Sequence, residues 1–427
     1  MQWRPWFSSA LLGRITCSPL IVYPERRICK HPEQLSDWLF GTTGALAHAL
    51  APLRGRTGKG ETRECAVWLA LRYISGDLKQ ENVSRIVVID WSMIGDLVML
   101  SPCIRAIRAH YPKAHLALLG QPVSIATYKQ NSQVNELIPY ERSGGDFDLA
   151  SFRKTLGVIR AGRYDLAYIF HNSFGSALMA WLGRVRERVG YRHELRDLLL
   201  TKRLRRPEKR QHLIETKADM LRMSGLDVAD MHEEVSIDAP AAALWVRDKL
   251  GPNFGRNRPI IAVALGATME YKRWSREGLN AYLNMFPVNS CDFVFLGSPA
   301  DRQLYEGVYS YNNTVVDLIG QTTIEELTWV LNRADLFVGP DSGPVHLAVG
   351  RNTPVVALFG PTDPMICGPY QYERSVVVRS ERICPSCDAK HSKHVRQCLH
   401  TLEAHEVYYA SIGLLARYCP RWTLATA

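Results

Sequence analysis

An aspartate stands where a predicted strand gives way to a predicted helix. RIVVID (Arg85–Asp90) is a short apolar run typical of a buried strand, and in the following WSMIGDLVMLSP, Asp96 comes directly after a glycine. A carboxylate at the mouth of a parallel sheet can take a proton from a hydroxyl group, which is general-base chemistry. It can also cap the helix that begins there, and the residues alone leave both roles open.

A second set of polar residues follows the predicted strand ADLFVGP (Ala334–Pro340). Asp341, Ser342 and Gly343 come at the turn into the next helix. Free backbone N–H groups and the helix dipole at such a turn suit a phosphate or diphosphate. The simpler alternative is helix capping by Asp341 or Ser342.

The loop ALGATMEYKRW (Ala264–Trp274) adds a hydroxyl at Thr268 and a cation at Lys272. These groups complement a diphosphate as a hydrogen-bond donor and a point charge, with a solvated basic loop as the alternative. Because this loop also follows a strand of the same expected sheet, both loops should meet at one sheet edge, which favours the anion site.

Alternating strands and helices must position these residues. Short apolar runs separated by amphipathic segments predict parallel sheets covered by helices on both faces. The alternation pauses over Val235–Pro259, as in an interdomain connection, and then restarts. The sequence therefore predicts an α/β protein with two doubly wound domains facing each other across a cleft. The expected strands are Arg85–Asp90, His115–Gly120, Asn135–Tyr140, Tyr164–Phe170, Pro259–Gly266, Asp292–Gly297, Ala334–Pro340 and Pro354–Gly360.

The composition is that of an ordinary globular protein, with 46% hydrophobic and 22% charged residues in 427. The net charge of +10 suggests an anionic partner, such as a phosphorylated small molecule or an acidic lipid surface. Nucleic acid is disfavoured, because no aromatic interleaving or recognisable nucleic-acid module accompanies the basic residues. The ten cysteines, without an evident secretory signal, favour a reducing cytoplasm.

The first 84 residues carry two short apolar segments beside basic residues, Trp38–Leu53 and Cys65–Ile74. Neither provides the roughly 18 uninterrupted apolar residues expected of a spanning helix. We expect a helical N-terminal extension, which either lies in a membrane interface or packs on the body of the protein.

The segment Arg192–His212 is strongly basic. One interpretation is a solvated helix and loop. The other is a site for an anionic acceptor molecule. The candidate acceptor-binding residues are Arg192, Arg196, Lys202 and Arg203.

Two patterns are similar to metal sites. Asp146 and Asp148 have the spacing of metal-dependent sugar-nucleotide transferases, but they precede a helix, so a turn with helix capping is preferred. Cys384, Cys387 and Cys398 have zinc-like spacing, and a structural loop, a disulfide or a bound metal are the alternatives there. Since a lysine and a helix dipole already supply positive charge, we expect catalysis without a metal or other cofactor.

Taken in order, these motifs resemble those of the ADP-heptose:lipopolysaccharide heptosyltransferases, which form glycosyltransferase family 9 and have the GT-B fold of two Rossmann-like domains. The resemblance covers roughly Arg85 to Leu415 and leans toward the heptosyltransferase II type. It rests on the GD-apolar-SP stretch that contains Asp96 and on RAIRAHYP (Arg105–Pro112), HNSFGSAL (His171–Leu178), ERVGYRHELRDLLLT (Glu187–Thr201), YKRW (Tyr271–Trp274) and GPDSGPVHLAVGRNTPVVALFGPTDP (Gly339–Pro364).

The resemblance implies a role for each candidate residue. Asp96 would be the general base toward the acceptor hydroxyl, and a single base opposite the leaving group implies inversion at the anomeric carbon. His346 matches a family histidine of the donor site, although we favour a structural hydrogen-bonding role for it. Thr268, Lys272, Ser342 and Gly343 would hold the donor diphosphate, Asp341 would bind hydroxyls of the transferred sugar, and Asp301 would lie near the donor ribose.

The activity implied by the resemblance is transfer of a heptose from ADP-heptose to an inner-core sugar of lipopolysaccharide, at the cytoplasmic face of the inner membrane. Alternatives are a protein or another glycan as acceptor, a sugar-nucleotide epimerase, and a non-catalytic scaffold. A nicotinamide dehydrogenase is disfavoured, because the loop after RIVVID lacks a GxGxxG arrangement.

The expected organisation is an N-terminal extension (1–84), an acceptor domain with the general base (85–237), a linker (238–258), a nucleotide-sugar domain (259–401) and a C-terminal helix and tail (402–427). The pattern LEAHEVYYASIGLL predicts an amphipathic helix over Leu402–Leu415. The resemblance implies that this helix crosses back to the first domain.

Overall fold

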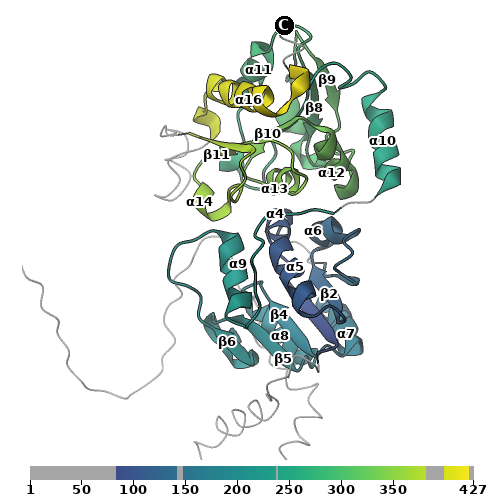
Figure 1. The fold of residues 1–427 in the computed structure, drawn as a ribbon, viewed down its shortest axis with the longest axis vertical. Helices are drawn as coiled ribbons and strands as arrows, with labels where there is room; N and C mark the ends of the chain where they lie inside the picture. Colours follow the sequence, from purple (N-terminus) through teal and green to yellow (C-terminus); the bar gives the residue numbers. More distant parts are fainter. Residues whose placement is uncertain (1–82, 142–147, 237–238, 381–398, 423–427) are drawn as a thin grey trace, which may run out of the picture. The chain divides into compact units, whose positions relative to one another are not determined.

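The computed structural model describes residues 83–141, 148–236, 239–380 and 399–422. In these ranges the chain forms two parallel six-stranded sheets with helices between successive strands (Figure 1). The predicted α/β class with two doubly wound domains is confirmed. The apolar segments Trp38–Leu53 and Cys65–Ile74 and the cysteine-rich segment Cys384–Cys398 lie outside the described residues.

The two sheets have the same topology. The first has the order β3-β2-β1-β4-β5-β6, and the second has the order β12-β11-β10-β7-β8-β9. The strands are β1 (Arg85–Ile89), β2 (His115–Gly120), β3 (Glu136–Pro139), β4 (Leu166–Ile169), β5 (Glu187–Tyr191), β6 (Lys202–Leu204), β7 (Ile260–Ala264), β8 (Asp292–Leu296), β9 (Thr314–Asp317), β10 (Leu336–Pro340), β11 (Val355–Phe359) and β12 (Ser375–Arg379).

In each sheet the strand order reverses between two central strands. These are β1 and β4 in the first sheet and β7 and β10 in the second. Ligands of open α/β sheets bind beyond the carboxyl ends of the strands at such a switch point. The loops after these four strands are therefore where a site is expected.

The central strands are buried on both faces, which explains why they read as continuous apolar runs. Ile86 to Ile89 of β1 have no exposed surface, and the same is true of Ile260 to Val263 of β7. The unpredicted strands lie toward the sheet edges, where exposure weakens the pattern: β6 contains Lys202 and Arg203, and β12 has two exposed valines.

Helices and 3₁₀ turns connect the strands on both sides of each sheet. The helix that the sequence predicts at Asp96 is divided at Met99 and Leu100 into α4 and α5. The helices are α4 (Ile94–Val98), α5 (Ser101–His110), α6 (Pro122–Ile125), α7 (Leu149–Gly162), α8 (Phe174–Leu182), α9 (Leu213–Arg222), α10 (Pro240–Leu250), α11 (Arg276–Met285), α12 (Ile324–Arg333), α13 (Gly343–Gly350), α14 (Pro364–Cys367) and α16 (Ala404–Tyr418), and the 3₁₀ turns are η3 (Ala126–Tyr128), η4 (Glu194–Leu199), η5 (Glu270–Lys272), η6 (Pro299–Tyr305) and η7 (Leu399–Thr401).

Two helices pack on the second sheet. In the segment 238–258, which the sequence analysis describes as a linker, α10 buries Val246 and Leu250 in the core of the second sheet and contacts α12. The helix α16 does not return to the first sheet as the resemblance implied. Its buried residues, among them Val407 and Leu414, pack with the second sheet and α11. Both helices carry apolar faces that the nearby second sheet covers.

The predicted helix cap before α7 is confirmed at Asp148. Its carboxylate accepts hydrogen bonds from the backbone N–H groups of Ala150 at 2.9 Å and Ser151 at 3.2 Å. Asp146 lies outside the described residues. No helix within the described ranges has both the length and the apolar character needed to cross a membrane.

The connection between the two domains is held on both sides. The Glu234 backbone N–H donates to Ser101 of α5 at 2.9 Å, and its carboxylate pairs with Arg105 at 3.1 Å. The next residue, Val235, donates to the Gly350 carbonyl at 3.0 Å at the end of α13. Adjacent residues of the connection are therefore bound to opposite domains.

The helices α4 and α13 approach each other through glycines (Figure 1). A Cβ added to Gly95 would lie 2.8 Å from Cδ2 of His346, and one added to Gly343 would lie 2.9 Å from Cβ of Ile94. Real Cβ atoms do not come this close to their neighbours, so each glycine permits the contact. At the contact between α4 of the first domain and α13 of the second, a glycine of each helix thus faces a side chain of the other.

We predict that Gly95→Ala destabilises the fold by about 1–3 kcal/mol, because the added methyl group would overpack the contact with His346. The matched control is Gly413→Ala in α16, where an added Cβ meets no atom within 4 Å. That substitution should stabilise the helix by about 0.5–1 kcal/mol. Free energies of unfolding from urea titrations measure both effects, and equal values for the two variants would contradict the overpacking argument.

Candidate functional site

The predicted site residues gather beyond the strands at the two switch points. Asp96 follows β1, and Asp341 and Ser342 follow β10. Thr268 and Lys272 lie in the loop after β7, with Thr268 exposed and Lys272 half-buried. The contact between α4 and α13 brings the loop after β1 to the loop after β10.

Asp96 lies in the first turn of α4, partly buried. Burial raises the pKa of its carboxyl group, the Lys217 ammonium opposes that effect, and the Asp90 carboxylate reinforces it. The imidazole of His346 and the backbone N–H of Met93 favour the ionised form. Met93 is the N-cap residue of α4, so the carboxylate also faces the helix start. A buried carboxylate with a raised pKa is suited to accept a proton.

Directly after β1 lies a buried ion pair that was not predicted from the sequence. The Lys217 Nζ atom of α9 is 2.5 Å from Oδ2 of Asp90, which directly follows β1. The other oxygen of Asp90 accepts from the Ser92 hydroxyl at 2.6 Å and backbone N–H at 3.2 Å. Burial raises the pKa of Asp90, but Lys217 outweighs it and the net pKa is lowered. Both groups are therefore charged.

A second buried pair connects the interdomain segment to α13. The Nδ1 atom of His346 lies 2.9 Å from Oε2 of Glu233, and both side chains are almost fully buried. Burial lowers the pKa of His346, whereas Glu233 raises it more, with smaller contributions from Asp341 and Asp96. The pair holds the imidazole in the structural hydrogen-bonding position that the sequence favoured, directly against Gly95.

Asp341 and Lys272 form an ion pair between the loops of the second domain. The Lys272 Nζ atom is 2.7 Å from Oδ2 of Asp341, which is 8% exposed. The thiol of Cys367 lies 3.6 Å from the same oxygen, and burial with the nearby carboxylate raises its pKa to about 12. That thiol is consequently a neutral packing group at neutral pH. The cation is held beside the start of α13.

Ser342 is the N-cap residue of α13, but its side chain does not cap the helix. Its hydroxyl instead donates to the Pro340 carbonyl at 3.0 Å. The side chain of Ser342 thus makes no hydrogen bond to the first backbone N–H groups of α13. The first of these N–H groups belongs to Gly343, which has no side chain to cover it. This geometry disagrees with helix capping by Ser342, and the anion site stays a prediction.

Asp301 lies beyond a different strand, β8, in a capping box with Ser298. Its Oδ2 atom accepts from the Ser298 backbone N–H at 2.8 Å and hydroxyl at 2.7 Å. Its carboxylate would meet a Cβ placed on Gly266, so Asp301 lies beside the loop that leads to Lys272. One carboxylate oxygen is used in the turn.

The four candidate acceptor residues do not form one exposed group. Arg196 is fully buried, and it donates to the His171 carbonyl at 3.0 Å and to the Asn172 side chain at 3.2 Å beyond β4. This contradicts its interpretation as an open acceptor contact, because a guanidinium that caps strand-end carbonyls is a structural group. Arg192 pairs with Asp197 at 2.8 Å, Lys202 donates to the Ser224 carbonyl at 3.2 Å, and Arg203 is exposed.

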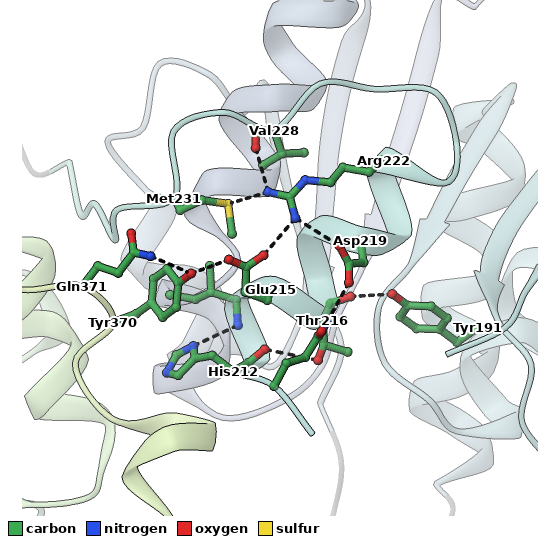
Figure 2. A network of polar contacts seen from close by, with 12 residues as sticks. Tyr191, His212, Glu215, Thr216, Asp219, Arg222, Val228, Met231, Tyr370 and Gln371 are labelled. Atoms are coloured by element: carbon green, nitrogen blue, oxygen red, sulfur yellow. Dashed lines mark hydrogen bonds and ion pairs between the residues drawn. The ribbon is translucent and has the colours of Figure 1, made fainter. Parts of the chain in front are cut away.

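The helix α9, which carries Lys217, is attached at its start to the second domain (Figure 2). The buried His212 accepts from the Ile214 N–H through Nδ1 at 3.2 Å, so Nε2 carries the proton and donates to the Gly368 carbonyl at 2.9 Å. Burial lowers the pKa of His212 to about 4, which keeps the ring neutral. Glu215 accepts from the Tyr370 hydroxyl and pairs with Arg222 at 2.8 Å.

Sequence reasoning missed Asp90, Lys217, Glu233 and the close approach at Gly95. The signal for Asp90 was its place at the very end of a buried strand. Lys217 stands among the apolar residues of LIETKADML, where a lysine on the buried face of a helix needs a carboxylate partner. No local pattern identifies which carboxylate that is.

Among the residues that the structure describes, no group of three or more His, Cys, Asp or Glu side chains is arranged to hold a metal ion. The positive charge at the site comes from Lys217, His346 and Lys272, and from the start of α13. The arrangement places the Asp96 carboxylate on one domain and a cationic helix start on the other.

We predict that the Glu233–His346 pair makes stability depend on pH. Because the folded pKa of His346 is raised above 6.5, the pair stabilises the fold fully below about pH 6.5, and this contribution is lost as the pH rises through the folded pKa. Glu233→Gln should lower the free energy of unfolding on the order of 3 kcal/mol at pH 6 and by less at pH 9.

Denaturant titrations at the two pH values measure this difference. The matched control is Asp230→Asn, which removes the partner of His232 in an exposed pair and should change stability by less than about 1 kcal/mol. A Glu233→Gln variant with the same loss at both pH values would show that the charge of the imidazole does not change between pH 6 and pH 9.

Comparison with known proteins agrees with this geometry. Residues 150–396, more than half of the chain, match the profile of "Glycosyltransferase family 9 (heptosyltransferase)". Lipopolysaccharide heptosyltransferase 2 of Escherichia coli K12 is 26% identical over 310 residues, which cover 69% of this chain and 87% of that protein.

Two solved structures share the fold. The glycosyl transferase family 9 protein of Veillonella parvula superposes with a TM-score of 0.69 at 22% identity, covering 78% of this chain and 97% of that one. An E. coli heptosyltransferase solved with ADP-2-deoxy-2-fluoro heptose gives a TM-score of 0.59 at 18% identity. The superposition covers 77% of this chain and 99% of that one. The resemblance drawn from the sequence motifs is confirmed: the chain belongs to glycosyltransferase family 9, the heptosyltransferase family.

Proposed function

We propose that this glycosyltransferase moves a heptose from ADP-heptose to an inner-core sugar of lipopolysaccharide, with inversion at the anomeric carbon. The observation that carries the proposal is the meeting of α4 and α13, which opposes the Asp96 carboxylate to the start of α13. The relatives named heptosyltransferase, and the E. coli relative solved with an ADP-heptose analogue, support the donor.

In this mechanism Asp96 takes the proton of the attacking acceptor hydroxyl. Its raised pKa makes it a stronger base than an ordinary aspartate, and it still ionises because Lys217 and His346 oppose the effect of burial. The acceptor oxygen then attacks the anomeric carbon from the face opposite ADP. General-base assistance of this kind contributes about 10²–10⁴-fold to the rate.

The leaving diphosphate would bind at the start of α13. Negative charge grows on it as the sugar–phosphate bond breaks, and backbone N–H groups from Gly343 onward together with Lys272 stabilise that charge. Thr268 adds a hydroxyl in the same loop, Asp341 is left to contact sugar hydroxyls, and His346 contributes its positive charge from beneath the helix start. Asp301 has one oxygen available for the donor ribose in the neighbouring loop.

The acceptor would approach from the first domain. Of the candidate residues, Arg192 and Arg203 are exposed and Lys202 is half-buried, whereas Arg196 is fully buried. Cations at β5 and β6 suit a phosphorylated, lipid-linked saccharide. A lipid-linked acceptor would bring the enzyme to the cytoplasmic face of the inner membrane as a peripheral protein.

The test is ADP release from ADP-heptose, with core lipopolysaccharides truncated at each heptose as acceptors. We predict acceptor-dependent release by the wild type, and a loss of about 10²–10⁴-fold in kcat for Asp96→Asn with ADP affinity retained. Release with no truncated core, despite donor binding, would move the acceptor to a protein or another glycan. Absence of ADP-heptose binding would overturn the donor assignment.

We also predict that transfer needs no divalent metal, because Lys272 and the start of α13 supply the positive charge that faces the diphosphate. The rate should be the same, within about twofold, in a metal-stripped buffer with EDTA and with added Mg²⁺. A loss of more than tenfold with EDTA that Mg²⁺ restores would show that a metal shares this role.

A further inference from the structure

The mechanism above leaves Lys217 of α9, which is buried in an ion pair with Asp90, without a direct part in the reaction. We propose that Lys217 is a positioning residue that, in balance with Asp90, keeps the Asp96 carboxylate ionised and ready to accept a proton. The inference rests on the proposed function, because it assigns Lys217 a role in the same reaction.

The geometry fixes the lysine at the carboxyl end of β1, where the segment that carries the base begins. Asp90 directly follows β1 and Asp96 lies in the first turn of α4, so both carboxylates stand beyond the same end of one strand. Asp90 has no exposed surface, Lys217 retains 9%, and the two are joined at 2.5 Å. Ser92 occupies the other oxygen of Asp90 with two hydrogen bonds. The pair therefore cannot reorient toward water without breaking these contacts.

The three charges influence one another. Lys217 is the largest of the groups that favour the ionised form of Asp96, and Asp90 disfavours it. In turn, burial lowers the pKa of Lys217, and the two carboxylates raise it above the ordinary value. One ammonium thus serves two buried carboxylates, and each carboxylate competes for it. The groups that face this trio from other elements are His346 of α13, paired with Glu233, and His171 and Cys103, which face Asp90 and Lys217.

The helix α9, which carries the lysine, is held at its start by contacts with the second domain. Figure 2 shows His212 and Glu215 at the start of α9 together with Tyr370 from the second domain. The Nζ atom of Lys217 also lies 5.6 Å from the centre of the Phe170 ring at the end of β4. Because the start of the helix and the lysine side chain are both held by contacts, the position of the ammonium group is fixed.

The test compares two substitutions that break the same ion pair from opposite sides. We predict that Lys217→Met moves the acid limb of kcat/KM against pH to higher pH, because Asp96 loses its cation. Asp90→Asn should move that limb to lower pH, because Asp96 then keeps the ammonium to itself. Each displacement should be about one pH unit, or about tenfold in kcat/KM on the acid side.

A merely structural pair would not give opposite displacements. If the wild type transfers heptose and both variants keep its pH profile, or shift it in the same direction, the proposal is overturned. Lys113→Met removes an exposed lysine before β2 and should leave the profile in place. If Lys217→Met does not fold, the Asp90→Asn/Lys217→Met double variant removes both charges, and its acid limb should lie above that of Asp90→Asn alone.

A second measurement separates this inference from the proposed function. Protein labelled with ¹³C at the aspartate carboxyl gives an NMR titration for Asp96, assigned by its loss in Asp96→Asn. The Asp96 titration should move up in Lys217→Met and down in Asp90→Asn even if no heptose is transferred. An unmoved titration would overturn the role of Lys217, whereas an inactive wild type with moved titrations would overturn only the proposed function.

Discussion

Two helices of different domains begin against each other, and a glycine of each faces a side chain of the other. Gly95 faces the ring of His346, and Gly343 faces the side chain of Ile94. Any larger residue at either glycine would push the helix starts apart, so the distance between the proton acceptor and the anion-binding turn is set by the absence of two side chains. The strands, switch points and loops bring the two halves of the site to this contact.

The charged side chains around this contact are arranged in pairs of opposite sign. Three cations lie near the helix starts, and each is matched to a carboxylate: Lys217 with Asp90, His346 with Glu233, and Lys272 with Asp341. Removing a charge from water is unfavourable unless a partner replaces the lost solvation, which explains why the buried charges come in pairs. Asp96 is the carboxylate left at the centre, influenced by two of these pairs without belonging to either.

Much of the fold could be read from the sequence, because central strands of a doubly wound sheet are apolar on both faces. The eight expected strands all appear, whereas β5 and β6, which the sequence analysis did not separate from a basic segment, and the edge strands β9 and β12 do not have that signature. The positions of Asp96, Asp341 and Lys272 at strand ends also followed from local pattern. The pairing of Lys217 with Asp90 did not, because it joins residues far apart in the chain.

The sequence also does not show which arginines of a basic segment are buried. The run around Arg192–His212 looked uniformly solvated or uniformly available to a ligand. In the structure Arg196 turns inward to strand-end carbonyls, while Arg203 stays exposed. Composition reports how many cations a segment has, and only the tertiary environment decides which of them are desolvated.

The connection at Glu234 and Val235 determines what motion remains between the domains. One residue is bound to α5 and the next to the end of α13, so the chain between the two anchors has no slack. While both anchors hold, the domains cannot slide past each other or separate along this path. Rotation about the few backbone torsions between them is what is left, and the segment therefore acts as a pivot rather than a tether.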